Sequence, residues 1–266
     1  MVELGLEPLT EHGLAVGFGD VGAPQLVGHE EQDEHSAAQD DPPQYAGDEA
    51  PSHVLDTTHA CPRRIGMAGY TQLVQVLFVC TANMCRSPMA AALFSRLALV
   101  GGDDAPEEVS VVSAGLMPGG YASPPEVVTT MAELGIDLSG HCSTQISPEL
   151  VAASDLIIVM ARRHAREVVL LDPESWGRTY MLKEFVRRGD RAGRRPADEA
   201  LGPWLDRLHH GRQRTDLVGS SPDDDMPDPI GGPLDGYRTT ARELAALVDH
   251  AATLLWVPRG IPTLPG

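Results

Sequence analysis

The chain of 266 residues is poor in aromatic residues, at 5%, and has a single lysine, Lys183, against 19 arginines. It lacks a run of about 18 apolar residues that could cross a membrane, and its first 62 positions contain no lysine or arginine to begin a secretory signal. Its formal net charge of −18 disfavours nucleic acid and anionic membranes as partners, because both attract basic patches. These absences predict a soluble, cytoplasmic protein.

Only four cysteines occur, at positions 61, 80, 85 and 142. They form no C-x-x-C pair and no Cys/His cluster of the kind that binds structural zinc. We therefore expect no metal site, no cofactor and no disulfide framework.

The first 66 residues differ in composition from the rest of the chain. They contain 13 acidic side chains and only two basic ones, Arg63 and Arg64, and show no helical or strand-like apolar period. Such a segment is expected to be a disordered acidic tail, because it cannot bury enough apolar surface to order itself, and a regulatory role for this tail is a further interpretation. The alternative is a misassigned start, with Met67 as the true first residue.

Residues 67–266 are predicted to form one folded domain. Within it, residues 189–222 are rich in Arg, Asp, Gly and Ser and are expected to be an irregular insertion. One amphipathic helix is expected there, because Leu201, Trp204, Leu205 and Leu208 recur at helical spacing, and it is expected to pack on the body of the domain.

The remaining sequence alternates between short apolar runs and amphipathic segments. Strands are expected at 74–79, 109–114, 155–160 and 178–182, and helices from Ser87 onward and at 124–134, 147–153, 162–171 and 234–255. This order predicts an α/β fold, a three-layer sandwich with a four-stranded parallel sheet in the flavodoxin-like order 2-1-3-4.

The segment from Cys80 to Ser87 lies between the first strand and the first helix. The loop reads Cys80-Thr81-Ala82-Asn83-Met84-Cys85-Arg86, and Ser87-Pro88 suggests a helix N-cap followed by proline. A loop in this position points its backbone N–H groups inward and makes a site for an anion. Arg86 could then bind two phosphate oxygens through its planar guanidinium group.

Cys80, at the first position of that loop, is expected to be a thiolate because the positive field stabilises the anion. It could attack a phosphomonoester to form a phosphocysteine, and the leaving oxygen would then need a proton from an acid elsewhere in the chain. Ser87 could donate its hydroxyl to the thiolate, and Asn83 could adopt the left-handed backbone conformation that closes the loop.

Together with Pro88, the loop resembles that of the low-molecular-weight protein-tyrosine phosphatases, which reads C-x-G-N-x-C-R-S-P. The resemblance, to the bacterial type, continues in four later motifs, and thioredoxin-coupled arsenate reductases share the fold. The motifs are Ser113-Ala114-Gly115, Gly135-Ile136-Asp137 with His141, the strand from Asp155 to Met160, and Asp228-Pro229-Ile230-Gly231.

The resemblance implies a role for each matching residue. Cys80 would be the nucleophile, Arg86 with the loop N–H groups would stabilise the transition state, and Asp228 would act as general acid and then as base. Cys85 would form a reversible disulfide with Cys80, while Ser113 and His141 would bond Asn83. The other loop residues, Thr81, Ala82, Met84 and Ser87, would complete the phosphate site.

Three Asp-Pro pairs occur, at Asp41, Asp172 and Asp228, and only the last stands in the family's setting for the acid. Asp225 is the reserve candidate, although residues 223–225 read first as a solvated acidic run.

The sequence departs from the family pattern at three places. Ala82 replaces a glycine, which is acceptable only if its φ angle is negative. Ile230 and Gly231 replace an aromatic pair, which weakens the wall that would stack on a phosphotyrosine ring. Thr144 stands where an arginine often follows the histidine.

The predicted activity is metal-independent hydrolysis of protein phosphotyrosine by a monomer, with a phosphorylated protein as substrate and a tyrosine kinase as a possible partner. The alternatives are a protein-arginine phosphatase, a thioredoxin-coupled arsenate reductase and a non-catalytic phosphate-binding module. A Cys-His hydrolase is weaker, because His141, His164 and the pair His209-His210 have no such setting.

Overall fold

A computed structural model describes residues 72–99 and 107–256 of the chain. The prediction for residues 1–66, including Met67 as an alternative start, lies outside the described residues. The described part contains a parallel sheet of four strands in the order β2-β1-β3-β4, which confirms the predicted fold class and strand order. The strands are β1 (Gln72–Cys80), β2 (Glu107–Gly115), β3 (Leu156–Val159) and β4 (Thr179–Met181).

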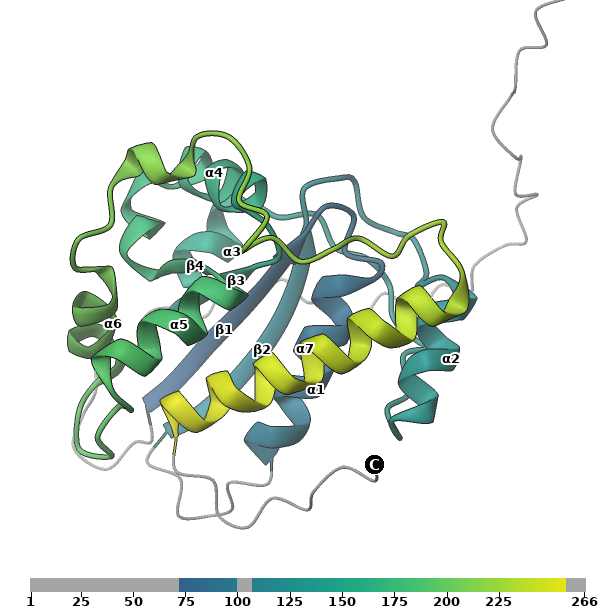
Figure 1. Cartoon of the computed structure of the whole chain (residues 1–266), viewed down its shortest axis with the longest axis horizontal. Coiled ribbons are helices and arrows are strands. Elements are labelled where there is room, and N and C mark those ends of the chain that lie inside the picture. Colours follow the sequence, from purple (N-terminus) through teal and green to yellow (C-terminus); the bar gives the residue numbers. More distant parts are fainter. Residues whose placement is uncertain (1–71, 100–106, 257–266) are drawn as a thin grey trace, which may run out of the picture. The chain divides into compact units, whose positions relative to one another are not determined.

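Helices cover both faces of this sheet, and Figure 1 shows α5 and α7 in front of the strands. The α-helices are α1 (Arg86–Leu99), α2 (Pro125–Glu133), α3 (Pro148–Ala153), α4 (Arg162–Leu171), α5 (Leu182–Ala192), α6 (Leu201–His209) and α7 (Leu234–Leu255). Two short 3₁₀ helices, η1 (Pro173–Arg178) and η2 (Arg214–Leu217), complete the described elements. In the described ranges, no helix has both the length and the apolar character needed to cross a bilayer.

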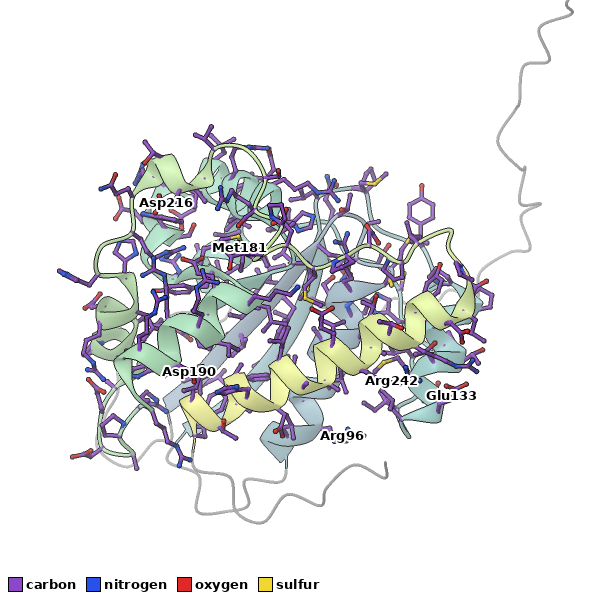
Figure 2. The ribbon with its side chains drawn as sticks, in the orientation of Figure 1. Arg96, Glu133, Met181, Asp190, Asp216 and Arg242 are labelled. Atoms are coloured by element: carbon purple, nitrogen blue, oxygen red, sulfur yellow. The ribbon has the colours of Figure 1, made fainter. Side chains whose placement is uncertain are left out.

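The central strand β1 is buried on both of its faces, as its nearly continuous apolar sequence predicts. Val76 and Phe78 pack with α1, α5 and α7 on one face. Leu77 and Val79 point to the other face and pack with residues of α3 and α4. Charged side chains such as Glu133, Asp190 and Asp216 are exposed on the outside (Figure 2). The carboxyl end of β1, where Cys80 lies, is therefore fixed by packing from two layers.

The structure corrects the predicted start of the first helix. That helix was expected to begin at Ser87 as N-cap, but α1 begins at Arg86, and the Cys85 carbonyl accepts the Met89 N–H. The Ser87 hydroxyl is bonded within the loop instead. Pro88 fits the first turn because its missing N–H would have no partner there.

Residues 189–222 contain more regular structure than the predicted irregular insertion. They include the end of α5, which sequence analysis did not predict, together with α6 and η2. The predicted amphipathic helix is confirmed, because Leu201, Trp204, Leu205 and Leu208 are all buried in α6. A buried ion pair between Arg212 and Glu184, at 2.9 Å, also ties this region to α5.

Candidate active site

The loop from Cys80 to Arg86 joins the carboxyl end of β1 to the first residue of α1. Asn83 has a φ angle of 55° and is the one non-glycine residue with positive φ in the described ranges. Asparagine tolerates this left-handed conformation better than most residues. Ala82 does not have positive φ, so its replacement of glycine introduces no backbone strain at that position.

The Asn83 side chain is fully buried, and both its amide nitrogen and its amide oxygen form hydrogen bonds. Its amide nitrogen donates to Ser87 Oγ at 2.9 Å and to Ser113 Oγ at 2.8 Å. Its amide oxygen accepts the Thr144 N–H at 2.8 Å, and its main-chain oxygen lies 2.7 Å from His141 Nε2. Ser113 and His141 are thus in the expected contact with Asn83. Thr144 takes part through its backbone, which does not require the arginine side chain of the family pattern.

Gly115 lies directly beneath the loop. A Cβ atom at this position would stand 2.6 Å from Asn83 N and 2.7 Å from the carbonyl carbon of Ala82. Both neighbours are backbone atoms, so a side chain here would displace the loop. This close approach explains why the Ser113-Ala114-Gly115 motif ends in glycine.

Cys80 is buried, and its Sγ lies 3.0 Å from Ser87 Oγ. Ser87 has one hydroxyl proton, which can go to this sulfur or to the Ala114 carbonyl oxygen at 3.2 Å. Because Ser87 Oγ also accepts a bond from Asn83, its proton is free to point away from that residue. A thiolate at Cys80 is a stronger acceptor than a neutral carbonyl, so this geometry stabilises the anion.

Arg86 is the last residue of the loop and is only 3% exposed. One terminal nitrogen donates to the Met226 carbonyl at 3.0 Å, and the other approaches Thr81 Oγ1 at 3.4 Å and forms an ion pair with Asp228. Its Nε is buried and has no hydrogen-bond partner among the described residues. The guanidinium group therefore keeps a donor for an anion in the loop and also contacts the predicted acid.

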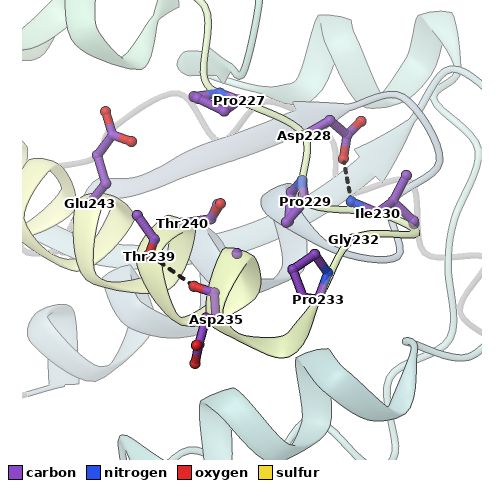
Figure 3. A pocket seen from close by; sticks show the side chains of 11 residues that line it. Pro227, Asp228, Pro229, Ile230, Gly232, Pro233, Asp235, Thr239, Thr240 and Glu243 are labelled. Atoms are coloured by element: carbon purple, nitrogen blue, oxygen red, sulfur yellow. Dashed lines mark hydrogen bonds between the residues drawn. The ribbon is translucent and has the colours of Figure 1, made fainter.

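Asp228 lies in the segment before α7, which is far more open than the loop. Its side chain is one-third exposed, and Ile230 is 49% exposed. Figure 3 shows Asp228 beside an open hollow, with its carboxylate bonded to the Ile230 N–H at 3.4 Å. The predicted acid is thus brought to Arg86, while the position of the missing aromatic pair faces solvent.

Of the predicted solvated run, Asp223 is exposed as expected, but Asp224 and Asp225 are not fully solvated. Asp224 is buried and forms an ion pair with Arg187 of α5. Asp225, the reserve acid, accepts the Arg162 N–H at 2.7 Å and so caps the first turn of α4. Partners distant in sequence determine both contacts, and neither carboxylate is bonded to Arg86.

Cys85 and Met84 complete the loop. Cys85 is buried, with its Sγ 3.8 Å from Met89 Sδ, and Met84 is half-buried. Burial, followed by the nearby charges of Asp228 and Cys80, raises the pKa of Cys85 to about 12. Cys80 and Cys85 are both free thiols in this structure, so their disulfide stays a prediction.

Two residues of α4, missed by sequence reasoning, contact Thr81 of the loop. Arg163 donates to Thr81 Oγ1 at 2.7 Å, and His164 Nε2 lies 3.1 Å from the same oxygen. His164 is fully buried. Nothing in the sequence marks it, because one histidine on an amphipathic helix has no chemical signature. Nowhere in the described ranges do three His, Cys, Asp or Glu side chains lie close enough together to bind a metal ion.

Comparison with known proteins gives concordant results. Residues 75–198 match the family model described as low molecular weight phosphotyrosine protein phosphatase. A probable low molecular weight protein-tyrosine-phosphatase, EpsP of Ralstonia solanacearum, is 43% identical over 41% of this chain and 71% of its own length. A protein-arginine-phosphatase of Geobacillus stearothermophilus is 31% identical over 68% of this chain and 95% of its own.

Comparison with solved structures gives the same family. A crystal structure of a low molecular weight protein tyrosine phosphatase from T. tengcongensis is 31% identical, with a TM-score of 0.51 over 68% of this chain and 99% of the other.

Proposed function

Because this chain belongs to the low molecular weight phosphotyrosine protein phosphatase family, we propose that it hydrolyses phosphomonoesters on protein through a phosphocysteine at Cys80. The observation that carries this proposal is the position of Arg86, which lies in the phosphate loop and forms an ion pair with Asp228. A single guanidinium group thus connects the phosphate site to the acid.

In the first step, the Cys80 thiolate attacks phosphorus and the ester P–O bond breaks. The proposed acid, Asp228, gives its proton to the leaving oxygen. Arg86 and the loop N–H groups stabilise the charge that develops on the phosphoryl oxygens. The Ser87 hydroxyl supports the thiolate before attack and after its release.

In the second step, a water molecule attacks the phosphocysteine. The Asp228 carboxylate takes a proton from this water, the P–S bond breaks, and inorganic phosphate leaves. The thiolate and the carboxylic acid are both restored. Every proton transfer in the cycle uses a residue of the chain, so we expect turnover without a divalent metal.

Phosphotyrosine on protein is the proposed substrate, as the names of relatives such as EpsP suggest. A specific observation also favours phosphoarginine. The relatives named protein-arginine-phosphatase match 68% of this chain, against 41% for EpsP, and Ile230 and Gly231 provide no aromatic wall. If tyrosine is the substrate residue, a tyrosine kinase must act in the same compartment. We place both in the cytoplasm and expect the phosphatase to act as a monomer.

The test is steady-state turnover of p-nitrophenyl phosphate by the full chain in EDTA, beside Cys80→Ser and Arg86→Lys. We expect Cys80→Ser to lower kcat by about 10⁴-fold or more, because the nucleophile is lost. Arg86→Lys should lower it by about 10³-fold, because lysine cannot reproduce the planar fork. Turnover that survives Cys80→Ser, or that requires a metal, would exclude the mechanism.

A second assay decides the substrate class. The same peptide, carrying either phosphotyrosine or phosphoarginine, is offered to the wild-type chain, and kcat/KM is compared. A higher value for phosphotyrosine supports the first proposal, and the reverse order supports the arginine phosphatase.

A further inference from the structure

His164 is an ionisable side chain that the proposed mechanism does not use. It lies in the first turn of α4, is fully buried, and has its Nε2 3.1 Å from Thr81 Oγ1 in the phosphate loop. Its Nδ1 is also buried and has no hydrogen-bond partner among the described residues. Burying a ring nitrogen without a hydrogen-bond partner costs free energy that an apolar side chain at this position would not cost. The buried imidazole therefore calls for an explanation.

The neighbours of Thr81 determine which atom carries the proton. Its Oγ1 accepts from an Arg163 terminal nitrogen at 2.7 Å and lies 3.4 Å from an Arg86 terminal nitrogen. Guanidinium groups only donate, so the Thr81 hydroxyl must give its own proton to another acceptor. Among the described groups in contact with this hydroxyl, His164 Nε2 is the one able to accept the proton. Arg163 Nε, 3.3 Å from the same nitrogen, also donates there.

These contacts require a neutral ring with its proton on Nδ1. Burial, and then the positive charges of Arg86 and Arg163, lower the pKa of His164 to about 3. The ring therefore stays neutral at the pH values where a phosphatase of this kind would be assayed, and its Nε2 lone pair remains available.

We propose that His164 is a positioning residue of the phosphate loop, which accepts the Thr81 hydroxyl proton and so turns the Thr81 oxygen toward the guanidinium groups of Arg86 and Arg163. This inference rests on the proposed function. Thr81 directly follows the Cys80 nucleophile, so fixing its side chain also fixes the first peptide of the loop. Two guanidinium groups on one oxygen concentrate positive charge where a phosphate dianion would bind.

The experiment is a double-mutant cycle in the full chain. His164→Leu removes the acceptor at similar volume, Thr81→Val removes the hydroxyl at similar shape, and the third variant combines both. The measured quantities are kcat and KM for p-nitrophenyl phosphate and Ki for inorganic phosphate. We expect each single variant to raise Ki by about threefold to tenfold, the effect of one hydrogen bond, and the double variant to be no worse than Thr81→Val alone.

Two further variants separate positioning from packing. His164→Gln can present an amide oxygen near the position of Nε2, so it should recover most of the phosphate affinity. Val168→Ala, a buried change on the same helix, should lower the melting temperature and leave Ki for phosphate unchanged. The proposal is overturned if His164→Leu lowers only the melting temperature, or if the effects of His164→Leu and Thr81→Val multiply in the double variant.

A spectroscopic measurement does not depend on turnover. Imidazole ¹H–¹⁵N correlation spectra of the wild-type chain should show His164 protonated on Nδ1 and unprotonated on Nε2 from pH 5 to pH 8. A proton on Nε2 would refute the assignment. If the wild type has no phosphatase activity, the proposed function fails, while this spectrum and phosphate binding by calorimetry still decide the role of His164.

Discussion

The phosphate loop and the Asp228 segment meet at Arg86, but they are built differently. The loop is buried at Cys80, Asn83, Cys85 and Arg86 and is bonded to α1, β2, α4 and the segment before α3. Asn83 alone has four hydrogen bonds. The Asp228 segment is partly exposed, and its carboxylate contacts Arg86 and the Ile230 N–H.

This difference separates two tasks of the proposed reaction. Binding an anion requires donors that are already in place, because reorganising them during the reaction would add to the barrier. Transferring a proton requires one carboxyl group that can reach the leaving oxygen, which tolerates a more open setting. We therefore expect changes in the loop to impair phosphate binding, and changes in the Asp228 segment to impair turnover or substrate preference.

Among the changes that compare the two regions, Asp228→Asn should have the largest effect. We expect kcat for phenyl phosphate to fall by about 10²–10⁴-fold, because the poor leaving group then receives no proton. The loss should be smaller for p-nitrophenyl phosphate, whose phenolate leaves more readily. At the same time, Ki for inorganic phosphate should decrease, because a negative charge beside Arg86 is removed.

Asp235→Asn is the matched control for this change. Asp235 lines the same hollow from the first turn of α7 and pairs with Arg238 at 3.1 Å, not with Arg86 (Figure 3). It should leave kcat and Ki unchanged. Weaker phosphate binding in Asp228→Asn would contradict the separation of the two regions.

Gly115→Ala should have the next largest effect. The added Cβ would stand 2.6 Å from Asn83 N, so the loop has to move. A displacement on the order of 1 Å should lower kcat/KM by about 10²-fold. In contrast to Asp228→Asn, this change should also raise Ki for phosphate. Gly202→Ala, in open space on α6, should change neither constant. Normal phosphate affinity in Gly115→Ala would show that the loop is less rigid than its bonds suggest.

The third effect is a pH dependence of stability on the phosphate-loop side. His164 has a pKa of about 3 when folded, against an ordinary value of 6.5, so between these values the unfolded chain binds an additional proton. Its contribution to stability is present above pH 6.5 and is lost as pH falls toward 3, at up to about 1.4 kcal/mol per pH unit.

Urea unfolding at pH 7, 6 and 5 measures this dependence. The free energy of unfolding of the wild type should fall more steeply with decreasing pH than that of His164→Gln. Parallel curves for the two proteins would mean that His164 does not stay neutral in the folded chain.

Much of the loop could be predicted from sequence because its determinants are local. A continuous apolar run predicted β1, and asparagine predicted the left-handed residue at position 83. The Ser87 N-cap was wrong because its hydroxyl is bonded to Cys80 and Asn83, an arrangement that needs the folded loop. The residues adjacent in sequence do not show which of several hydrogen-bond partners the Ser87 hydroxyl will have in the folded chain.

The errors elsewhere have the same cause on a longer scale. Asp224 and Asp225 read as a solvated run, but Arg187 and the α4 backbone bind them from distant parts of the chain. The role of His164 could not be predicted, because its contact with Thr81 forms only when the fold places α4 beside the phosphate loop. The acid could be selected among three Asp-Pro pairs only by resemblance to a family, since no local signal distinguishes Asp228.

The smallest expected effect tests the open segment itself. Ile230→Tyr places an aromatic ring at an exposed position two residues after Asp228, where a phosphotyrosine ring could stack. We expect KM for a phosphotyrosine peptide to fall by about twofold to tenfold, the value of one aromatic pair, with KM for the matching phosphoarginine peptide unchanged. Leu170→Tyr, the same kind of change at a still more exposed position on α4, should affect neither peptide. If Ile230→Tyr lowers KM equally for both peptides, the ring contacts parts of the peptide other than the phosphorylated side chain. The Asp228 segment would then not select that side chain.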